Sequence, residues 1–265
     1  MSGDISTPGV CVRVPPIDGG DVLAREVAGL LRCPQLGIDE TSVFEIELQW
    51  RDRWCVVQTA HNVAVEIDFE SAPYQRRIEQ HSIASDRLVR AVTGRRDRAE
   101  ALTVFDATAG IGRDALVLAA AGCRLTLVEQ HPLVAFLLRQ ALEQARESSR
   151  ERLCEAAGRM TLREGNSCDV MAQWSGAAPD VIYLDPMFEF PRGSAAAKKE
   201  LALLQRITSS DVLEQENRTL FDAALRLAKK RVIVKRTPGK DYLANAAPSH
   251  VLESKTVRFD VYQLG

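Results

Sequence analysis

The second part of this chain alternates short apolar segments with longer amphipathic ones, and this alternation constrains the fold more than any other feature. Five apolar runs have the length of buried strands, and the segments between them have helical composition and spacing. Strands that alternate with helices pair in parallel, because each crossover returns the chain to the same edge of the sheet. The expected strands are residues 102–105, 124–128, 160–163, 181–184 and 231–234, and the expected helices are residues 112–121, 132–146 and 211–229.

Two more apolar runs, residues 251–252 and 257–262, are expected to form an antiparallel pair that closes the sheet. The whole is then an α/β, Rossmann-like domain with a mostly parallel seven-stranded sheet. Between residues 43 and 69, by contrast, apolar and polar residues alternate with period two. This pattern predicts two or three antiparallel strands with one wet face. We therefore expect a small strand-rich N-terminal domain, residues 1–75, and a larger domain, residues 76–265.

Charge and cysteine usage restrict the possible partners. The formal net charge is −2, so nucleic-acid binding would depend on local basic surfaces, such as residues 76–98 or Lys235 and Arg236 at the end of a predicted strand. The six cysteines have no metal-ligand spacing, and no segment resembles a signal peptide or a membrane span. We expect a cytoplasmic protein that binds neither a metal nor a membrane.

The loop after the first strand of the α/β region carries the first functional signal. Gly110 and Gly112 let the backbone turn tightly beside a ligand, and the helix that follows offers unpaired N–H groups. Glu129 ends the next strand, where doubly wound folds place a carboxylate that binds ribose hydroxyls. Together, in a βαβ setting, these features predict a nucleotide-like cofactor rather than an ordinary turn.

The charge of this loop bears on which cofactor it holds. Residues 110–115 match the G-x-G-x-x-A pattern of dinucleotide sites, so an NAD-dependent oxidoreductase is an alternative. That class would need a catalytic Tyr–Lys or His pair, which cannot be placed here. Asp106 and Asp114 would repel a pyrophosphate but attract the sulfonium and ammonium groups of S-adenosylmethionine (SAM). We predict SAM as the cofactor.

A second functional signal follows the fourth strand, where Asp185, Pro186 and Phe188 lie at the carboxyl edge of the predicted sheet. Ligands of open α/β sheets bind outside this edge. Asp185 could accept hydrogen bonds from an exocyclic amine of a nucleobase, Pro186 would keep the turn rigid, and Phe188 could stack on an extruded base. We predict these three as catalytic residues. The alternative is a common Asp-Pro turn followed by a core phenylalanine.

These motifs together resemble the bacterial RsmJ family of 16S ribosomal RNA guanine-N2 methyltransferases, which are class I SAM-dependent enzymes. The matching segments are residues 106–115, 129–132, 181–188, 231–236 and 258–262. The resemblance implies transfer of one methyl group from SAM to the N2 amine of a guanine near the 3′ end of 16S RNA. The partner would be free 16S RNA or the assembled 30S ribosomal subunit.

The resemblance also implies which positions contact the cofactor. Carried over by position, and joined to Asp106, Gly110 and Gly112 of the loop, they are Arg113, Asp114, Glu129, Gln130, Ser167, Cys168 and Asp185. The family commonly has a basic residue in place of Gln130 and a serine in place of Cys168. The remaining alternatives are an adenine-N6 methyltransferase acting on DNA or RNA, and an RNA-binding protein that keeps the fold without catalysis.

Overall fold

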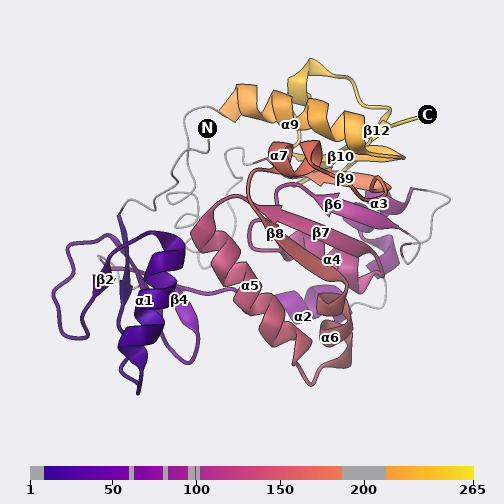
Figure 1. Ribbon diagram of the computed structural model, residues 1–265. Helices are drawn as coiled ribbons and strands as arrows, with labels where there is room; N and C mark the ends of the chain where they lie inside the picture. Colours follow the sequence, from indigo (N-terminus) through magenta and orange to yellow (C-terminus); the bar gives the residue numbers. More distant parts are fainter. Residues whose placement is uncertain (1–8, 60–62, 80–82, 95–98, 100–101, 187–212) are drawn as a thin grey trace. The chain divides into compact units, whose positions relative to one another are not determined.

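The chain forms two compact units, each built around its own β-sheet (Figure 1). The computed structural model describes residues 9–59, 63–79, 83–94, 99, 102–186 and 213–265. The first unit contains described residues up to Ile67 together with residues 131–137, and the rest of the described chain forms the second unit. The boundary expected after residue 75 stays a prediction.

The first unit contains a five-stranded sheet with helix α1 (Gly20–Leu31) packed against β1 and β2. Its strands, in the order β2-β1-β3-β4-β5, are β1 (Val10–Arg13), β2 (Gln35–Leu36), β3 (Ile46–Trp50), β4 (Trp54–Gln58) and β5 (Val63–Val65). The antiparallel pairing of β3 with β4 and of β4 with β5 was predicted from the period-two pattern. Strands β1 and β2, which pair in parallel, have no counterpart among the predicted elements.

The expectation of one wet face is wrong for the centre of this sheet. Residues 54–57 of β4 are all buried, so both faces of this strand are covered. Glu47 of β3, a polar position in the alternating pattern, is only 2% exposed because Arg13 of β1 pairs with it. At Glu47 the alternation therefore marks a polar residue that is paired inside the protein, whereas Ala64 and Glu66 are exposed between the buried Val65 and Ile67, as predicted.

The second unit contains the predicted seven-stranded sheet. Its strands, in the order β11-β12-β10-β9-β6-β7-β8, are β6 (Thr103–Asp106), β7 (Arg124–Glu129), β8 (Met160–Glu164), β9 (Val181–Leu184), β10 (Arg231–Arg236), β11 (His250–Glu253) and β12 (Arg258–Gln263). Strand β12 runs antiparallel to β10 and β11, and the other pairs are parallel. The register pairs Asp106 with Leu127 and Tyr183. The carboxyl ends of β6, β7 and β9 therefore lie at one edge.

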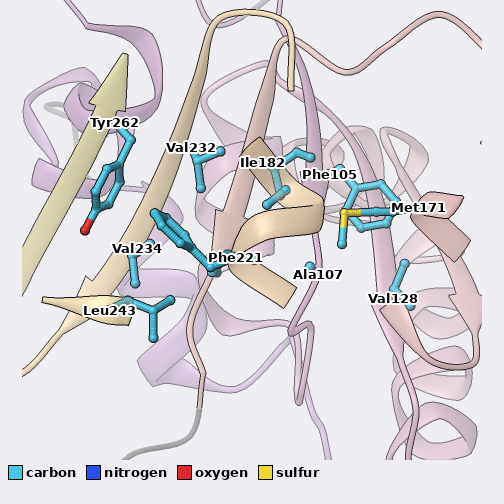
Figure 2. Packing of buried hydrophobic residues seen from close by; sticks show 12 residues of the cluster. Phe105, Ala107, Val128, Met171, Ile182, Phe221, Val232, Val234, Leu243 and Tyr262 are labelled. Carbon is cyan, nitrogen blue, oxygen red and sulfur yellow. The ribbon is translucent and has the colours of Figure 1, made fainter. Parts of the chain in front are cut away.

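Helices cover both faces of this sheet (Figure 1). The helices after β5 are α2 (Ala72–Glu79), α3 (Arg87–Thr93), α4 (Arg113–Ala120), α5 (Pro132–Arg146), α6 (Glu151–Gly158), α7 (Ser167–Ala172) and α9 (Leu213–Leu227). Of these, α3, α4, α6, α7 and α9 contact strands of this sheet. On the α7 and α9 face, Phe221 and Met171 pack among strand residues, as Figure 2 shows. The ring of Phe221 lies 4.8 Å from that of Tyr262 on β12, which joins the antiparallel strand to the core.

Candidate active site

The loop after β6 is fixed by backbone hydrogen bonds to both neighbouring strands. Ala107 N donates to Tyr183 O on β9, and Ala109 N donates to Val128 O on β7. Gly110 and Gly112 both have positive φ angles, 51° and 73°. A Cβ atom at Gly112 would lie 2.8 Å from a methyl group of Leu138, which would have to shift, and the positive φ would strain any other residue. The loop is thus held as a rigid cradle at the start of α4.

Glu129 lies beside this loop, as its position at the end of β7 predicted. Its Oε2 accepts a hydrogen bond of 2.8 Å from Gly110 N. One glutamate oxygen therefore helps to hold the loop in place, an interaction that the sequence did not indicate. Gln130, the next residue, is exposed and accepts a hydrogen bond from Asn166 at 3.3 Å.

Residues at the start of α7 approach the same loop. Ser167 is buried, and its hydroxyl donates to Ala107 O at 2.6 Å. Asn166 caps the helix by accepting from Cys168 N at 2.8 Å. Burial raises the pKa of the Cys168 thiol. The structure therefore brings Ser167 to the loop, while Asn166 joins Gln130 to Cys168 and was absent from the predicted set.

Asp106 ends β6 and is 2% exposed. Burial raises the pKa of its carboxyl to about 8, although Thr108 N donates to Oδ1 at 3.1 Å and partly opposes that rise. The repulsion from Asp114 and Asp185 adds to it. Asp106 is thus a neutral acid near pH 7 in the protein without cofactor, not the fixed negative charge that the sequence suggested.

The other two aspartates share one lysine. Lys235 Nζ, at the end of β10, donates to Asp114 Oδ2 at 2.6 Å and to Asp185 Oδ2 at 2.8 Å. Asp114 lies in the first turn of α4, and the Tyr183 hydroxyl also donates to its Oδ2, at 2.7 Å. Lys235 was expected to meet phosphate. Its ammonium is instead engaged by two carboxylates.

Opposing influences set the protonation of this cluster. Burial alone would raise the pKa of Asp114, but the positive charges of Lys235 and Arg77 hold it well below its usual range. Burial would lower the pKa of Lys235, and the two carboxylates raise it instead. Burial raises the pKa of Asp185, Lys235 opposes this rise, and Asp114 adds to it. Asp114 and Lys235 are therefore both charged near neutral pH.

Helix α2 supplies residues that sequence reasoning did not assign to the site. Arg77 Nη1 donates to Asp114 Oδ1 at 3.0 Å. Tyr74 lies under Arg113 of the loop, with the guanidinium carbon 5.6 Å from the ring centroid and Nε 3.3 Å from the hydroxyl. Arg77 belongs to the basic window of residues 76–98, yet its side chain is used inside the protein. Its spacing in the sequence gave no signal of this.

The loop after β9 is joined directly to the loop after β6. Asp185 N donates to the Thr108 hydroxyl at 2.6 Å, and Pro186 is buried behind it. The carboxylate of Asp185 is 33% exposed, so it can reach a ligand. Phe188 lies outside the described residues. Two of the three predicted catalytic residues are therefore placed at the edge that also carries the glycine loop.

The set of polar groups at this edge suits a cation with a nucleoside attached. Carboxylates of Asp114, Glu129 and Asp185 come from α4, β7 and the loop after β9, and the positive φ of Gly112 favours glycine in the loop between them. Such groups attract sulfonium and ammonium charges and would repel a pyrophosphate. Within the described part of the chain, no three metal-ligating side chains come together, and no helix there is long and apolar enough to cross a bilayer.

Comparison with known proteins identifies the family. Residues 32–264 match the family described as putative SAM-dependent methyltransferase. Ribosomal RNA small subunit methyltransferase J of Thioalkalivibrio sulfidiphilus is 41% identical over 202 residues, which cover 76% of each chain. The chain belongs to the RsmJ family of SAM-dependent methyltransferases. The resemblance seen in the sequence is thereby confirmed, and the cofactor of the family is SAM.

Two further comparisons show how much of the chain similar proteins cover. The protein of the same name from Pseudoalteromonas atlantica is 47% identical over 163 residues, 60% of this chain and 62% of its own length. The chain thus spans about three fifths of that relative. A crystal structure of a SAM-dependent methyltransferase from Neisseria gonorrhoeae has a TM-score of 0.68 and 28% identity, and the match covers 96% of this chain and 95% of that one. The predicted fold class is confirmed.

Proposed function

We propose that this chain transfers a methyl group from SAM to the N2 amine of a guanine in 16S ribosomal RNA. The observation that carries the proposal is the position of Asp185. Its carboxylate reaches the surface at the carboxyl edge of the sheet, and its backbone N–H is bonded to the glycine loop. A hydrogen-bond acceptor therefore lies beside the loop that would hold the methyl donor.

The cofactor site is formed by the loop after β6, the end of β7 and the start of α7. We infer that Asp106, Gly110, Gly112, Arg113 and Asp114 hold SAM from the loop, with Glu129, Gln130, Ser167, Cys168 and Asp185 around it. SAM would supply a methyl group activated by the positive charge of its sulfonium: as the amine nitrogen bonds the methyl carbon, the carbon–sulfur bond would break, S-adenosylhomocysteine would leave, and the amine would lose its proton after transfer. The neutral state of Asp106 before binding implies that the arriving cation would lower its pKa again.

Asp185 would act on the nucleophile. The lone pair of an exocyclic amine is delocalised into the base, and a carboxylate that accepts its N–H bonds favours the geometry and charge of attack. Pro186 keeps the turn fixed and offers no competing donor. Phe188 would stack on the guanine after it has left its helix or loop. Alignment of the amine with the methyl group then supplies much of the rate.

The names of the relatives support small-subunit ribosomal RNA as the substrate. We propose free 16S RNA or the assembled 30S subunit as the partner, and the cytoplasm as the compartment where they meet. An adenine-N6 methyltransferase would use the same Asp-Pro-x-aromatic turn. Identification of the methylated nucleoside is therefore part of the test.

The first experiment is calorimetric titration with SAM and, separately, with NAD. We expect micromolar binding of SAM and no binding of NAD. Purified protein is then given tritiated SAM with free 16S RNA and, separately, with 30S subunits, both lacking the modification, and the digested RNA is analysed by mass spectrometry. N2-methylguanosine is the expected product; N6-methyladenosine or no transfer would reject the proposal.

A further inference from the structure

Lys235 bridges two carboxylates at this edge, and the proposed function assigns it no role. We propose that Lys235 is a positioning residue that holds the Asp185 carboxylate in the orientation needed to accept the amine of the substrate. The inference rests on the proposed function, because it gives Asp185 its chemical task.

The ammonium of Lys235 is fixed from the side away from the substrate. Asp114 accepts from it at 2.6 Å, and Asp114 is itself held by Tyr183 at 2.7 Å and by Arg77 at 3.0 Å. These partners lie on α4, β9 and α2, three elements of the same unit. The Lys235 ammonium is therefore held in place even if the Asp185 side chain rotates. Its hydrogen bond fixes the orientation of the Asp185 carboxylate.

Exposure rises along the chain of contacts toward the place where a substrate would bind. The exposed fraction of the side chain is 11% for Asp114, 30% for Lys235 and 33% for Asp185. Thr108 fixes the backbone of Asp185, and Lys235 fixes Oδ2 of its carboxylate. Among the described residues, Oδ1 accepts no hydrogen bond. That oxygen is thus left to meet an N–H group of the base.

The charges around Asp185 explain why this position needs a cation. Asp114 on α4 is a charged acid that repels Asp185, whereas Asp106 on β6 and the Tyr183 hydroxyl on β9 are neutral near pH 7. Arg77 faces Asp114, on the far side. Of the residues that the structure describes, Lys235 is therefore the positive group that contacts Asp185 directly. A lysine ammonium is a compact charge with three donors, which suits it to bridge two carboxylates.

The test compares Lys235→Met, Lys235→Arg and, as a control, Lys255→Met, which removes an exposed lysine from the turn after β11. Steady-state methyl transfer and its pH dependence are measured for each. For Lys235→Met we expect kcat to fall about 100-fold, the cost of a misplaced catalytic group, with both KM values within about threefold of wild type. Lys235→Arg should retain activity within about tenfold, and Lys255→Met should match wild type.

The pH profile separates positioning from general damage. Lys235 lowers the pKa of Asp185, so its removal raises that pKa, and the acidic limb of kcat should move to higher pH by about one unit. In Lys235→Arg, the limb should stay in place. A uniform loss of kcat with an unmoved limb would overturn the proposal. So would loss of SAM affinity as the main effect, since Lys235 would then be a cofactor contact.

A second measurement does not depend on turnover. The carboxyl carbon of Asp185 is followed by NMR against pH in the protein without cofactor, with Asp185→Asn used for assignment. We expect its midpoint to rise in Lys235→Met and to stay near wild type in Lys235→Arg. If wild type methylates no RNA, the proposed function fails while this titration still decides whether Lys235 controls Asp185. If Lys235→Met does not fold, the arginine variant gives the same decision: a displaced midpoint or limb contradicts the proposal.

Discussion

Each unit of the protein pairs a carboxylate with a basic residue, but the two pairings differ in how completely they are closed. In the first unit, Arg13 donates to both oxygens of Glu47 at 2.7 Å and to three backbone carbonyl groups at 3.0 Å. In the second unit, one ammonium is shared by Asp114 and Asp185. Glu47 is 2% exposed, whereas the Asp185 side chain is 33% exposed.

This difference indicates which pair serves the fold and which serves chemistry. Arg13 lowers the pKa of Glu47 to about 2, and Gln49 occupies Oε2 of the same carboxylate. No ligand could bind there without breaking bonds already made. Asp185 has an oxygen directed to no described partner, so a ligand can bind without that loss. A half-satisfied ion pair at a sheet edge is therefore a better sign of a site than a fully satisfied one.

The largest expected effect comes from the partly exposed pair of Lys235 and Asp185, which we call the open pair. Asp185→Ala should lower methyl transfer by about 100- to 1000-fold, because the amine loses its acceptor. The thermal midpoint should change little, because Lys235 keeps Asp114 as a partner. Tritiated-methyl incorporation measures the first effect and calorimetry the second. Asp222→Ala, on the exposed side of α9, is the control; retained activity in Asp185→Ala would remove this residue from catalysis.

The buried pair of Arg13 and Glu47 should show the opposite result, a loss of stability without a loss of SAM affinity. Glu47→Gln leaves the guanidinium of Arg13 without its counter-charge and should lower the free energy of unfolding by about 3 kcal/mol. SAM affinity of the folded protein should be unchanged. Arg25→Ala breaks an exposed pair with Asp21 in the same unit and should cost less than about 0.5 kcal/mol. Denaturant unfolding and calorimetry test both, and a loss of SAM affinity in Glu47→Gln would contradict the division of roles.

Gly112→Val tests the glycine loop after β6, which lies beside the open pair. Valine at φ 73° is strained, and its Cβ would meet Leu138 and Phe69, so we expect a loss of about 2 kcal/mol in stability. The displaced loop should also weaken SAM binding by at least about tenfold. Gly29→Ala is the matched control, since a Cβ there meets nothing within 4 Å. Unchanged SAM affinity in Gly112→Val would exclude the loop from the cofactor site.

The smallest expected effect is the change in the free energy of unfolding, per pH unit, that Asp106 causes. Its pKa is about 8 in the folded protein, against about 4 in an unfolded chain. The folded state therefore holds a proton that the unfolded state has lost, and stability falls as pH rises between these two values. The expected slope is at most about 1.4 kcal/mol per unit. Asp106→Asn should flatten the slope between pH 5 and 7; an equal slope in both proteins would show that Asp106 is ionised.

Most of the second sheet could be predicted, because each strand is a short apolar run that can be recognised in the local sequence. The range 181–184 was predicted as found, and β12 forms the expected antiparallel pair with β11. Helix α7 was missed because six residues make fewer than two turns, too few to show a repeat. In the first unit, the helical spacing of Ala24, Val27, Ala28 and Leu31 could have indicated α1.

The site was predictable only where it is local. Gly110 and Glu129 belong to one βαβ unit, whose geometry brings them together in any protein of this class. Arg77 and Lys235 come from segments far from Asp114 in the chain, and either base could have paired with many other acids. Lys235 was instead expected to meet phosphate. Which acid a base contacts is decided by tertiary packing, and spacing in the sequence does not record it.

The bridge made by Lys235 also has a consequence for synthesis of the protein. A chain emerges from the ribosome with its N-terminal part first, so Asp114 and Asp185 are made well before Lys235. Until β10 is complete and has paired with β9, the two carboxylates lack the ammonium that they share. A nascent chain that stops before residue 235 could hold most of the sheet and still lack an ordered active site. The ordered active site would then form only at a late step of translation, after Lys235 has been made.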